Sequence, residues 1–442
     1  MKLLLVTWYF PPSRTIAAVR LGKLARYLLA QGHDVRVLTP LDPPLPQDLD
    51  VEFPAEQVVR TAWHPNVKGT KSSRRPAPAA VGTVPAGGVG KPSMLKRNLW
   101  RLHSSFSEFP DPRAPWLPFA AEAGAKLFAE WQPDLVFASG PPFTTLLAGQ
   151  ELSDKFAVPL VLEFRDRWSE DPYSPPFFWR RWRNRLAEDE LIRNARALVT
   201  VSEPWAEAYR ARYGKPTAVI YNGYDAEFCG DGPFDGAAGR EGLEIVYTGG
   251  IYPGYRDPSP LFAAMKQLDE KGLSCRMIFH GVRPATVAPL AEAQGVSHLV
   301  EVREVLAHEE ALRRQRESDI LVLLQWNDPK EQGNVPGKFF EYLGARRPIL
   351  VLGLHDGVPA TIVKERGAGF FSNESDAIAK QLVRWLEIKK EKGLLPPVPE
   401  AGRAGFSRDE QYARLEKFLE DLIAGGPVRG RAPGSEALIQ TG

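Results

Sequence analysis

Few residues in this sequence can bind a metal or form a disulfide. It contains two cysteines and seven histidines among 442 residues, and no pair of them has the spacing of a metal-binding motif. Cys229 and Cys275 are too few for a disulfide framework, which fits a reducing compartment. We therefore expect a cytoplasmic protein without a metal site.

Long apolar runs and a strong charge of one sign are also absent. No uncharged apolar stretch approaches the length needed to span a bilayer. The N-terminus, "MKLLLVTWYFPP", lacks the length and cleavage site of a signal peptide and predicts a first strand instead. The 56 basic and 54 acidic groups leave a formal charge of +2, which gives no global field of the kind that nucleic-acid-binding proteins have.

Short apolar runs alternate with longer amphipathic segments along the whole chain. Predicted strands lie at 2–8, 34–39, 134–139, 158–164 and 197–201, and again at 243–248, 275–280, 299–303, 319–324 and 348–352. Predicted helices between them lie at 17–31, 119–131, 143–156 and 179–195, and then at 258–271, 285–294, 308–316, 336–346 and 374–390. This alternation is typical of α/β domains built on doubly wound parallel sheets.

The length and the repeated pattern predict two consecutive Rossmann-like domains. We place the N-terminal domain at 1–222 and the C-terminal domain at 241–405, because the segment between them is rich in Gly, Asp and Pro. A helix within 406–424 is expected to return to the first domain, and 425–442 is expected to be a disordered tail.

One segment departs from this pattern. Between Gln57 and Ser107 there is no acidic residue, but there are nine lysines and arginines. Its middle part, about 65–95, is rich in Pro, Gly, Ala and Ser, which predicts a mobile basic insertion in the first domain.

Two strand-to-helix loops are candidates for ligand binding, because ligands of doubly wound sheets lie beyond the carboxyl ends of the strands. The first, "WYFPPSRTIAAVR", lacks the G-x-G-x-x-G of dinucleotide-binding enzymes. In the second, "YTGGIYPGYRDP", Gly249 and Gly250 let the backbone approach an anion, and Arg256 can reach a phosphate. An ordinary structural turn remains the alternative in both places.

A third candidate is the stretch "GNVPGKFFEYLGARR". Gly337 and Lys338 stand at a predicted helix start, where free backbone N–H groups and an ammonium suit a phosphate. Glu341 lies one turn further on the same face, where its carboxylate can accept hydrogen bonds from a ribose diol. The alternative is that Arg346 or Arg347 pairs with Glu341.

Several segments in this order resemble glycosyltransferase family 4, the retaining GT-B enzymes, over nearly the whole chain. The matching segments are "YFPP…RLGKLARYLLAQGHDVRVLTP", "VTVSEPWAEAYRARYG", "IYNGYD", "YTGGIYPGYRDP" and "GKFFEYLGARRPIL". The resemblance implies a nucleotide-sugar donor bound mainly by the second domain, an acceptor bound by the first, and catalysis with neither a metal nor a cofactor.

The resemblance also implies roles for individual residues. On the donor side they are Asn222, Gly249, Gly250, Arg256, Gly337, Lys338 and Glu341. On the acceptor side they are Pro12, Ser13, Arg14, Arg165 and Asp166, the last in "EFRDRWSEDPY". We expect Arg256 and Lys338 to stabilise the departing diphosphate and Asp166 to orient or deprotonate the acceptor hydroxyl. A structural salt bridge to Arg165 or Arg167 is the alternative for Asp166.

The sequence departs from the family at one important position. The family's E-x7-E motif ends at Glu341, but its first glutamate, which touches the donor sugar, would fall at Gly333. The donor-sugar contacts are therefore expected to differ. A sugar-nucleotide epimerase of the same fold and a non-catalytic transferase-like binding protein remain alternatives to a transferase acting in polysaccharide biosynthesis.

The segment "FFWRRWRNRLAEDELI" in the first domain mixes aromatic residues with arginines. This composition suits contact with anionic lipid headgroups, and the family resemblance implies an acceptor that is a glycan, a lipid-linked glycan or a natural product. The alternative is that Trp179 and Trp182 pack inside the domain. The sequence thus predicts either a cytoplasmic protein or one that also binds the inner membrane face peripherally.

Overall fold

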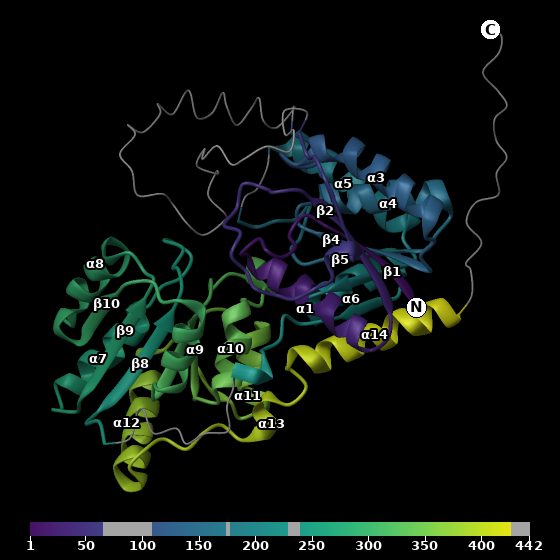
Figure 1. Ribbon diagram of the computed structural model, residues 1–442. Coiled ribbons are helices and arrows are strands. Elements are labelled where there is room, and N and C mark those ends of the chain that lie inside the picture. The colour runs from purple at the N-terminus through teal and green to yellow at the C-terminus, as the bar shows by residue number, and fades with distance from the viewer. Residues whose placement is uncertain (65–107, 174–176, 229–238, 426–442) are drawn as a thin grey trace.

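The computed structural model describes residues 1–64, 108–173, 177–228 and 239–425. Two parallel sheets lie in separate lobes, with helices on both faces of each sheet (Figure 1). The predicted mobile insertion at about 65–95 and residues 426–442 of the predicted tail lie outside the described residues.

The first sheet has seven parallel strands in the order β3-β2-β1-β4-β5-β6-β7. Its strands are β1 (Lys2–Thr7), β2 (Asp34–Pro40), β3 (Val58–Thr61), β4 (Leu135–Gly140), β5 (Leu160–Phe164), β6 (Ala197–Thr200) and β7 (Thr217–Val219). The central strands β4 and β5 are buried along their whole length, as their continuous apolar runs require. The strand order reverses between β1 and β4, which is a topological switch point.

The helices of the first domain cover this sheet on both faces. They are α1 (Ile16–Ala30), α3 (Leu117–Glu130), α4 (Thr144–Phe156), α5 (Phe178–Asn194) and α6 (Glu203–Tyr213). One core lies on the side of Trp116, Phe128 and Leu152, and the other lies on the side of Leu21, Leu24 and Leu28.

The second sheet has six parallel strands in the order β10-β9-β8-β11-β12-β13. Its strands are β8 (Leu243–Thr248), β9 (Cys275–His280), β10 (Val300–Arg303), β11 (Ile320–Leu324), β12 (Ile349–Leu352) and β13 (Gly369–Phe371). Its helices are α7 (Ser259–Asp269), α8 (Pro284–Gln294), α9 (His308–Arg316), α10 (Gly337–Ala345), α11 (Val358–Glu365), α12 (Ser375–Lys392) and α13 (Glu400–Arg403). The switch point here lies between β8 and β11.

The last helix, α14 (Arg408–Ala424), returns to the first domain and runs along α1 (Figure 1). Its start is fixed by a capping box between Ser407 and Glu410. Leu415 and Leu419 enter the core beside α1, and the Tyr412 hydroxyl donates to the Arg20 carbonyl at 2.8 Å. The predicted crossing back of the C-terminal helix is confirmed.

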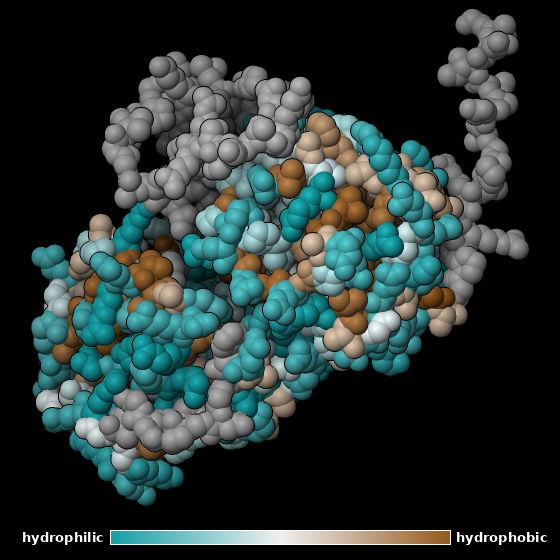
Figure 2. All heavy atoms as spheres, viewed as in Figure 1, coloured by the Kyte–Doolittle hydropathy of each residue, from teal (hydrophilic) through white to brown (hydrophobic). Residues whose placement is uncertain are grey.

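The predicted architecture of two doubly wound parallel sheets is confirmed, although some short elements were not predicted. Strands β3, β7 and β13 have three or four residues each, too few for a periodic pattern. No helix among the described residues is long and apolar enough to cross a membrane. On the face seen in Figure 2, hydrophilic side chains interrupt the apolar ones over both lobes.

Candidate active site

The loops that follow β8 and β11 meet at the switch point of the second sheet. The β8 loop carries Gly249, Gly250 and Arg256, and the segment after β11 leads to the first residue of α10, Gly337. The sequence predicted these two segments as separate candidates, and the parallel topology brings them together at one edge.

Lys338, in the first turn of α10, lies directly against the β8 loop. Its ammonium donates to the Thr248 carbonyl at 2.6 Å and lies 4.0 Å from the centroid of the Tyr247 ring. Burial in this slot lowers the pKa of Lys338. Gly249 has a φ of +93°, and a Cβ there would come 3.0 Å from the Lys338 ammonium, so the absence of a side chain leaves room for the ammonium beside the loop.

Arg256 folds back over the same loop. Its guanidinium donates to the Gly250 carbonyl at 3.2 Å and lies 4.5 Å from the centroid of the Tyr252 ring. Its charge is close enough to lower the pKa of Lys338 further. Two cations are thus held on either side of the Gly249–Gly250 turn.

Neither of these cations forms an ion pair within the part of the chain that the structure describes. No side chain caps the N-terminus of α10, which begins after Pro336. Two like charges that repel each other beside an uncapped helix N-terminus form a site for an anion with more than one negative charge. A diphosphate has this charge and size.

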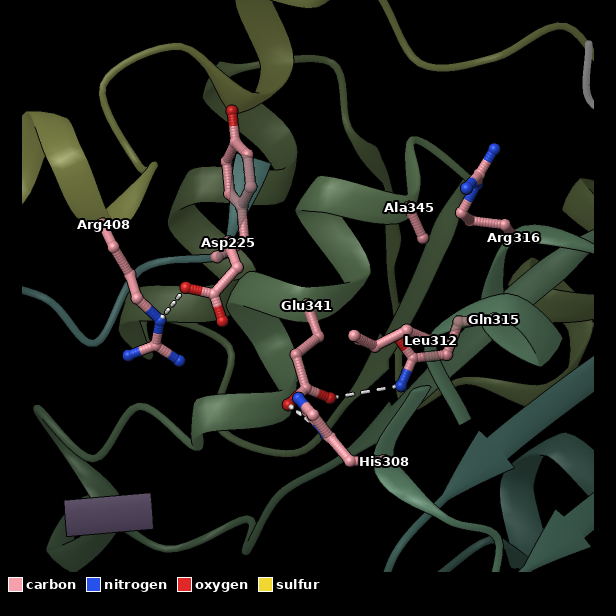
Figure 3. A pocket seen from close by; sticks show the side chains of 9 residues that line it. Asp225, His308, Leu312, Gln315, Arg316, Glu341, Ala345 and Arg408 are labelled. Carbon is pink, nitrogen blue, oxygen red and sulfur yellow. Dashed lines mark hydrogen bonds and ion pairs between the residues drawn. The ribbon is translucent and has the colours of Figure 1, made fainter. Parts of the chain in front are cut away.

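Glu341 lies one turn along α10 and lines a pocket between the second domain and α14 (Figure 3). Its carboxylate accepts a hydrogen bond from the Gln315 amide at 3.2 Å and lies 4.0 Å from the His308 ring nitrogen. The opposite side of the pocket holds the ion pair between Asp225 and Arg408, at 2.7 Å. A polar pocket of this kind suits the hydroxyls of a ribose.

Arg346 and Arg347, the two alternative partners of Glu341, form hydrogen bonds with other groups. Arg347 donates to the Arg316 carbonyl at 2.8 Å, and Arg346 donates to the Val398 carbonyl at 2.9 Å. The interpretation of Glu341 as an arginine-paired structural residue is therefore wrong. Its side chain remains 26% exposed, which leaves it accessible to a ligand.

Asn222 lies across from the N-terminus of α10, on the segment that joins the two domains. Its amide nitrogen is 4.0 Å from the position that a Cβ on Gly337 would take. The side-chain oxygen of Asn222 accepts from Arg20 at 3.4 Å. Ile16, at the start of α1, lies equally close to Gly337 and is 68% exposed. The N-termini of α1 and α10 therefore face each other between the domains.

The acceptor-side candidates of the β1 loop make contacts within the first domain. Ser13 is hydrogen-bonded to Gln47 at 3.0 Å, and Arg14 pairs with Asp48 at 3.0 Å while more than half of its side chain remains exposed. Pro12 is exposed beside them. Their predicted contact with an acceptor stays a prediction.

Arg165 and Asp166 follow β5 and point in different directions. The Arg165 guanidinium is directed into the domain, where it donates to the Pro141 carbonyl and lies 3.9 Å from Glu163. Asp166 is exposed and forms no salt bridge with any residue that the structure describes, so its alternative role as an ion-pair partner of Arg165 or Arg167 is wrong. Desolvation by the surrounding protein raises the pKa of Asp166, and the charge of Arg165 opposes the shift.

The structure also brings together residues that sequence analysis missed. Glu331 is 1% exposed and accepts hydrogen bonds from the Tyr173 hydroxyl, which belongs to the first domain, and from the Asn334 amide at 3.2 Å. The rings of Tyr252, Tyr255 and Trp326 surround Tyr173 at centroid distances of 5.6–6.2 Å. A single glutamate in "DPKEQGN" gave no signal of this burial, because the burial depends on the other domain.

Comparison with known families gives a match for the first part of the chain. Residues 17–228 match the family model for Glycosyltransferase Family 4. A search of curated proteins found no match.

Solved structures with the same fold cover nearly the whole chain. Sucrose-phosphate synthase from Thermosynechococcus elongatus aligns with a TM-score of 0.65 and 15% identity over 96% of this chain and 100% of its own. HepE of Anabaena in complex with UDP has a TM-score of 0.59 and 14% identity over 95% and 100%. A putative UDP-N-acetylglucosamine 2-epimerase from Listeria monocytogenes has a TM-score of 0.53 and 14% identity over 96% and 97%. These similarities show the GT-B fold that the sequence predicted.

Proposed function

We propose that the protein is a retaining, metal-independent glycosyltransferase that uses a nucleoside-diphosphate sugar, and the match of residues 17–228 to the model for Glycosyltransferase Family 4 supports this proposal. The observation that carries the proposal is the pair of cations, Lys338 and Arg256, beside the uncapped N-terminus of α10. The complex of HepE with UDP supports a nucleotide as the ligand of such a site.

In the proposed reaction the bond between the sugar and the diphosphate breaks as the acceptor oxygen bonds to the same face of the anomeric carbon. Negative charge grows on the departing diphosphate, where Lys338, Arg256 and the α10 N–H groups stabilise it. The acceptor hydroxyl gives its proton to a diphosphate oxygen, and Asp166 orients that hydroxyl. The acceptor is a glycan, a lipid-linked glycan or a natural product.

A panel of nucleotide sugars tests this function directly. UDP-, GDP-, ADP- and dTDP-sugars are added to the protein, and we expect one nucleotide class to raise the unfolding temperature and to be consumed when an acceptor is present. If the nucleotide sugar is isomerised without an acceptor, the protein is an epimerase. The putative epimerase from Listeria has a similar fold. Binding without turnover would favour a non-catalytic protein.

Glu341→Gln should weaken nucleotide binding by roughly 1–3 kcal/mol, because a ribose diol loses a charged acceptor. The fold should remain intact, since the Gln315 amide can still donate to the new side-chain oxygen. Calorimetry with the nucleoside diphosphate from the panel measures the change. Unchanged affinity in a folded variant would mean that Glu341 does not hold the ribose.

We also propose that α5 binds an anionic membrane surface at the inner face. Phe178, Trp182 and Leu186 are 81%, 66% and 49% exposed and stand four residues apart, so they form one apolar stripe. The expectation that Trp182 packs inside the domain is therefore wrong. Arg181 and Arg183 are exposed beside this stripe, and each arginine near an anionic surface contributes about 1 kcal/mol.

Sedimentation with vesicles tests the membrane proposal. We expect the protein to sediment with vesicles of anionic lipid, less so at high salt, and to remain in the supernatant with neutral vesicles. Arg181→Glu with Arg183→Glu should abolish sedimentation. The control is Lys364→Glu with Lys392→Glu, which makes the same change of charge on exposed positions of the second domain. Equal recovery in the supernatant with both kinds of lipid would remove the membrane from the proposal.

A further inference from the structure

Three consecutive residues of the second domain contact the first domain. The Glu331 carboxylate accepts from the Tyr173 hydroxyl, and the Gln332 carbonyl accepts from the Trp205 indole at 2.9 Å. Gly333 packs so closely on Trp205 that a Cβ would collide with its ring. We call these contacts, together with Asn334, the interdomain clasp.

The clasp lies in the segment that leads from β11 into α10. The Gln325 amide donates to the Asn334 carbonyl at 3.0 Å, and the Asn334 amide donates to the Tyr173 hydroxyl at 3.0 Å. Only Val335 and Pro336 separate Asn334 from Gly337, the first residue of α10. The position of the α10 N-terminus is therefore tied to the first domain through a chain of hydrogen bonds.

Glu331 is suited to hold this segment only when the domains are together. A carboxylate that is 1% exposed is costly to bury unless hydrogen bonds compensate for the lost water. One of its hydrogen-bond partners, Tyr173, belongs to the other domain. Desolvation raises the pKa of Glu331, while Tyr173, Asn334 and the nearby charge of Arg256 oppose the shift. Separating the domains would remove the hydroxyl and expose the carboxylate to water.

Tyr173 also connects the clasp to the acceptor side. It lies seven positions after Asp166, in the segment between β5 and α5 that also carries Arg165. The same contact that fixes the entry to α10 therefore fixes the segment on which the acceptor-orienting carboxylate stands. The hydrogen bonds of Tyr173 with Glu331 and Asn334 thus connect both halves of the proposed reaction across the two domains.

We infer that Glu331 is a positioning residue that, through Tyr173, aligns the diphosphate site of α10 with the acceptor side of the first domain. Because Glu331 is 1% exposed, we assign it this indirect role and not direct contact with a ligand. In the family motif, the first glutamate touches the donor sugar. Here Gly333 occupies the position of that glutamate and packs against Trp205. The nearby Glu331 instead makes a contact between the two domains. This inference rests on the proposed function.

Tyr173→Phe tests the inference, because it removes one hydroxyl and keeps the ring among Tyr252, Tyr255 and Trp326. We expect kcat to fall about tenfold, while KM for the donor and the Kd of the nucleoside diphosphate stay within about twofold, since misalignment affects the reacting geometry more than binding. Glu331→Ala should lower kcat at least as far. Glu331→Gln should restore most of it, because the amide oxygen can still accept from Tyr173.

The matched control is Tyr213→Phe. It also removes a hydroxyl that donates to a carboxylate, that of Asp189 at 2.6 Å, but both residues belong to the first domain. Amide hydrogen exchange across 331–336 gives a readout that needs no substrate, and only the clasp variants should exchange faster there. Normal kcat and normal exchange in Tyr173→Phe would overturn the inference alone. No turnover of any nucleotide sugar by the unsubstituted protein would overturn the proposed function and this role with it.

Discussion

Replacing Gly333 by glutamate should lower kcat by at least about a hundredfold, although it restores the residue that the family motif has at this position. Gly333 has a φ of +83°, which a side-chain-bearing residue adopts only with strain. A Cβ there would also lie 2.9 Å from the Ser202 hydroxyl and closer still to the Trp205 ring. The larger side chain must push the two domains apart, which breaks the clasp.

The reaction rate and nucleotide binding should respond differently to this substitution. The cations that hold the diphosphate belong to the second domain, so the Kd of the nucleoside diphosphate should stay within about fivefold while transfer is lost. Gly272→Glu is the matched control, because Gly272 also has a positive φ, +69°, but a Cβ there meets nothing within 4 Å. Comparing kcat of the two variants separates backbone strain from the collision. An unchanged or higher kcat in Gly333→Glu would contradict the clasp.

The parts of the site that depend on local sequence were predicted, and the parts that depend on the other domain were not. Gly249, Arg256 and Lys338 follow strands or begin a helix, so the parallel topology alone places them at one edge. The partner of Glu341 was missed, because Gln315 stands 26 positions away on α9 and gives no pattern of its own. The burial of Glu331 follows from Tyr173, 158 positions away in the chain.

The same distinction holds for the fold. Long runs such as "LEIVYT" and "CRMIFH" were predicted as strands with the bounds that β8 and β9 have. The residues of β3, "VVRT", stand at the head of the basic segment and were not predicted as a strand. They form a strand because they pair with β2 from Val37 to Pro40. A tertiary contact of this kind overrides weak local preference.

Lys338→Ala should lower kcat by about a hundredfold and should also weaken donor binding, because the charge on the leaving diphosphate grows in the transition state. Arg256→Ala should act in the same direction with a smaller effect. The Lys338 ammonium is enclosed between the Thr248 carbonyl and the Tyr247 ring, and a charge in a less solvated position acts more strongly on a nearby anion. Arg256 lies over Tyr252 at the more open side of the loop.

The measurement that checks this pair is a comparison of kcat and KM for each variant with the donor found in the nucleotide-sugar panel. The matched control is Lys364→Ala, which removes an exposed ammonium on α11 of the same domain and should leave both constants unchanged. Lys338→Arg should recover only part of the loss, because a planar guanidinium does not fit the slot that holds a compact ammonium. An increase in KM with unchanged kcat would show that the two cations bind the ground state and the transition state equally, so that they do not favour the chemical step itself. In that case the uncapped N-terminus of α10 would remain as the stabiliser of the departing diphosphate.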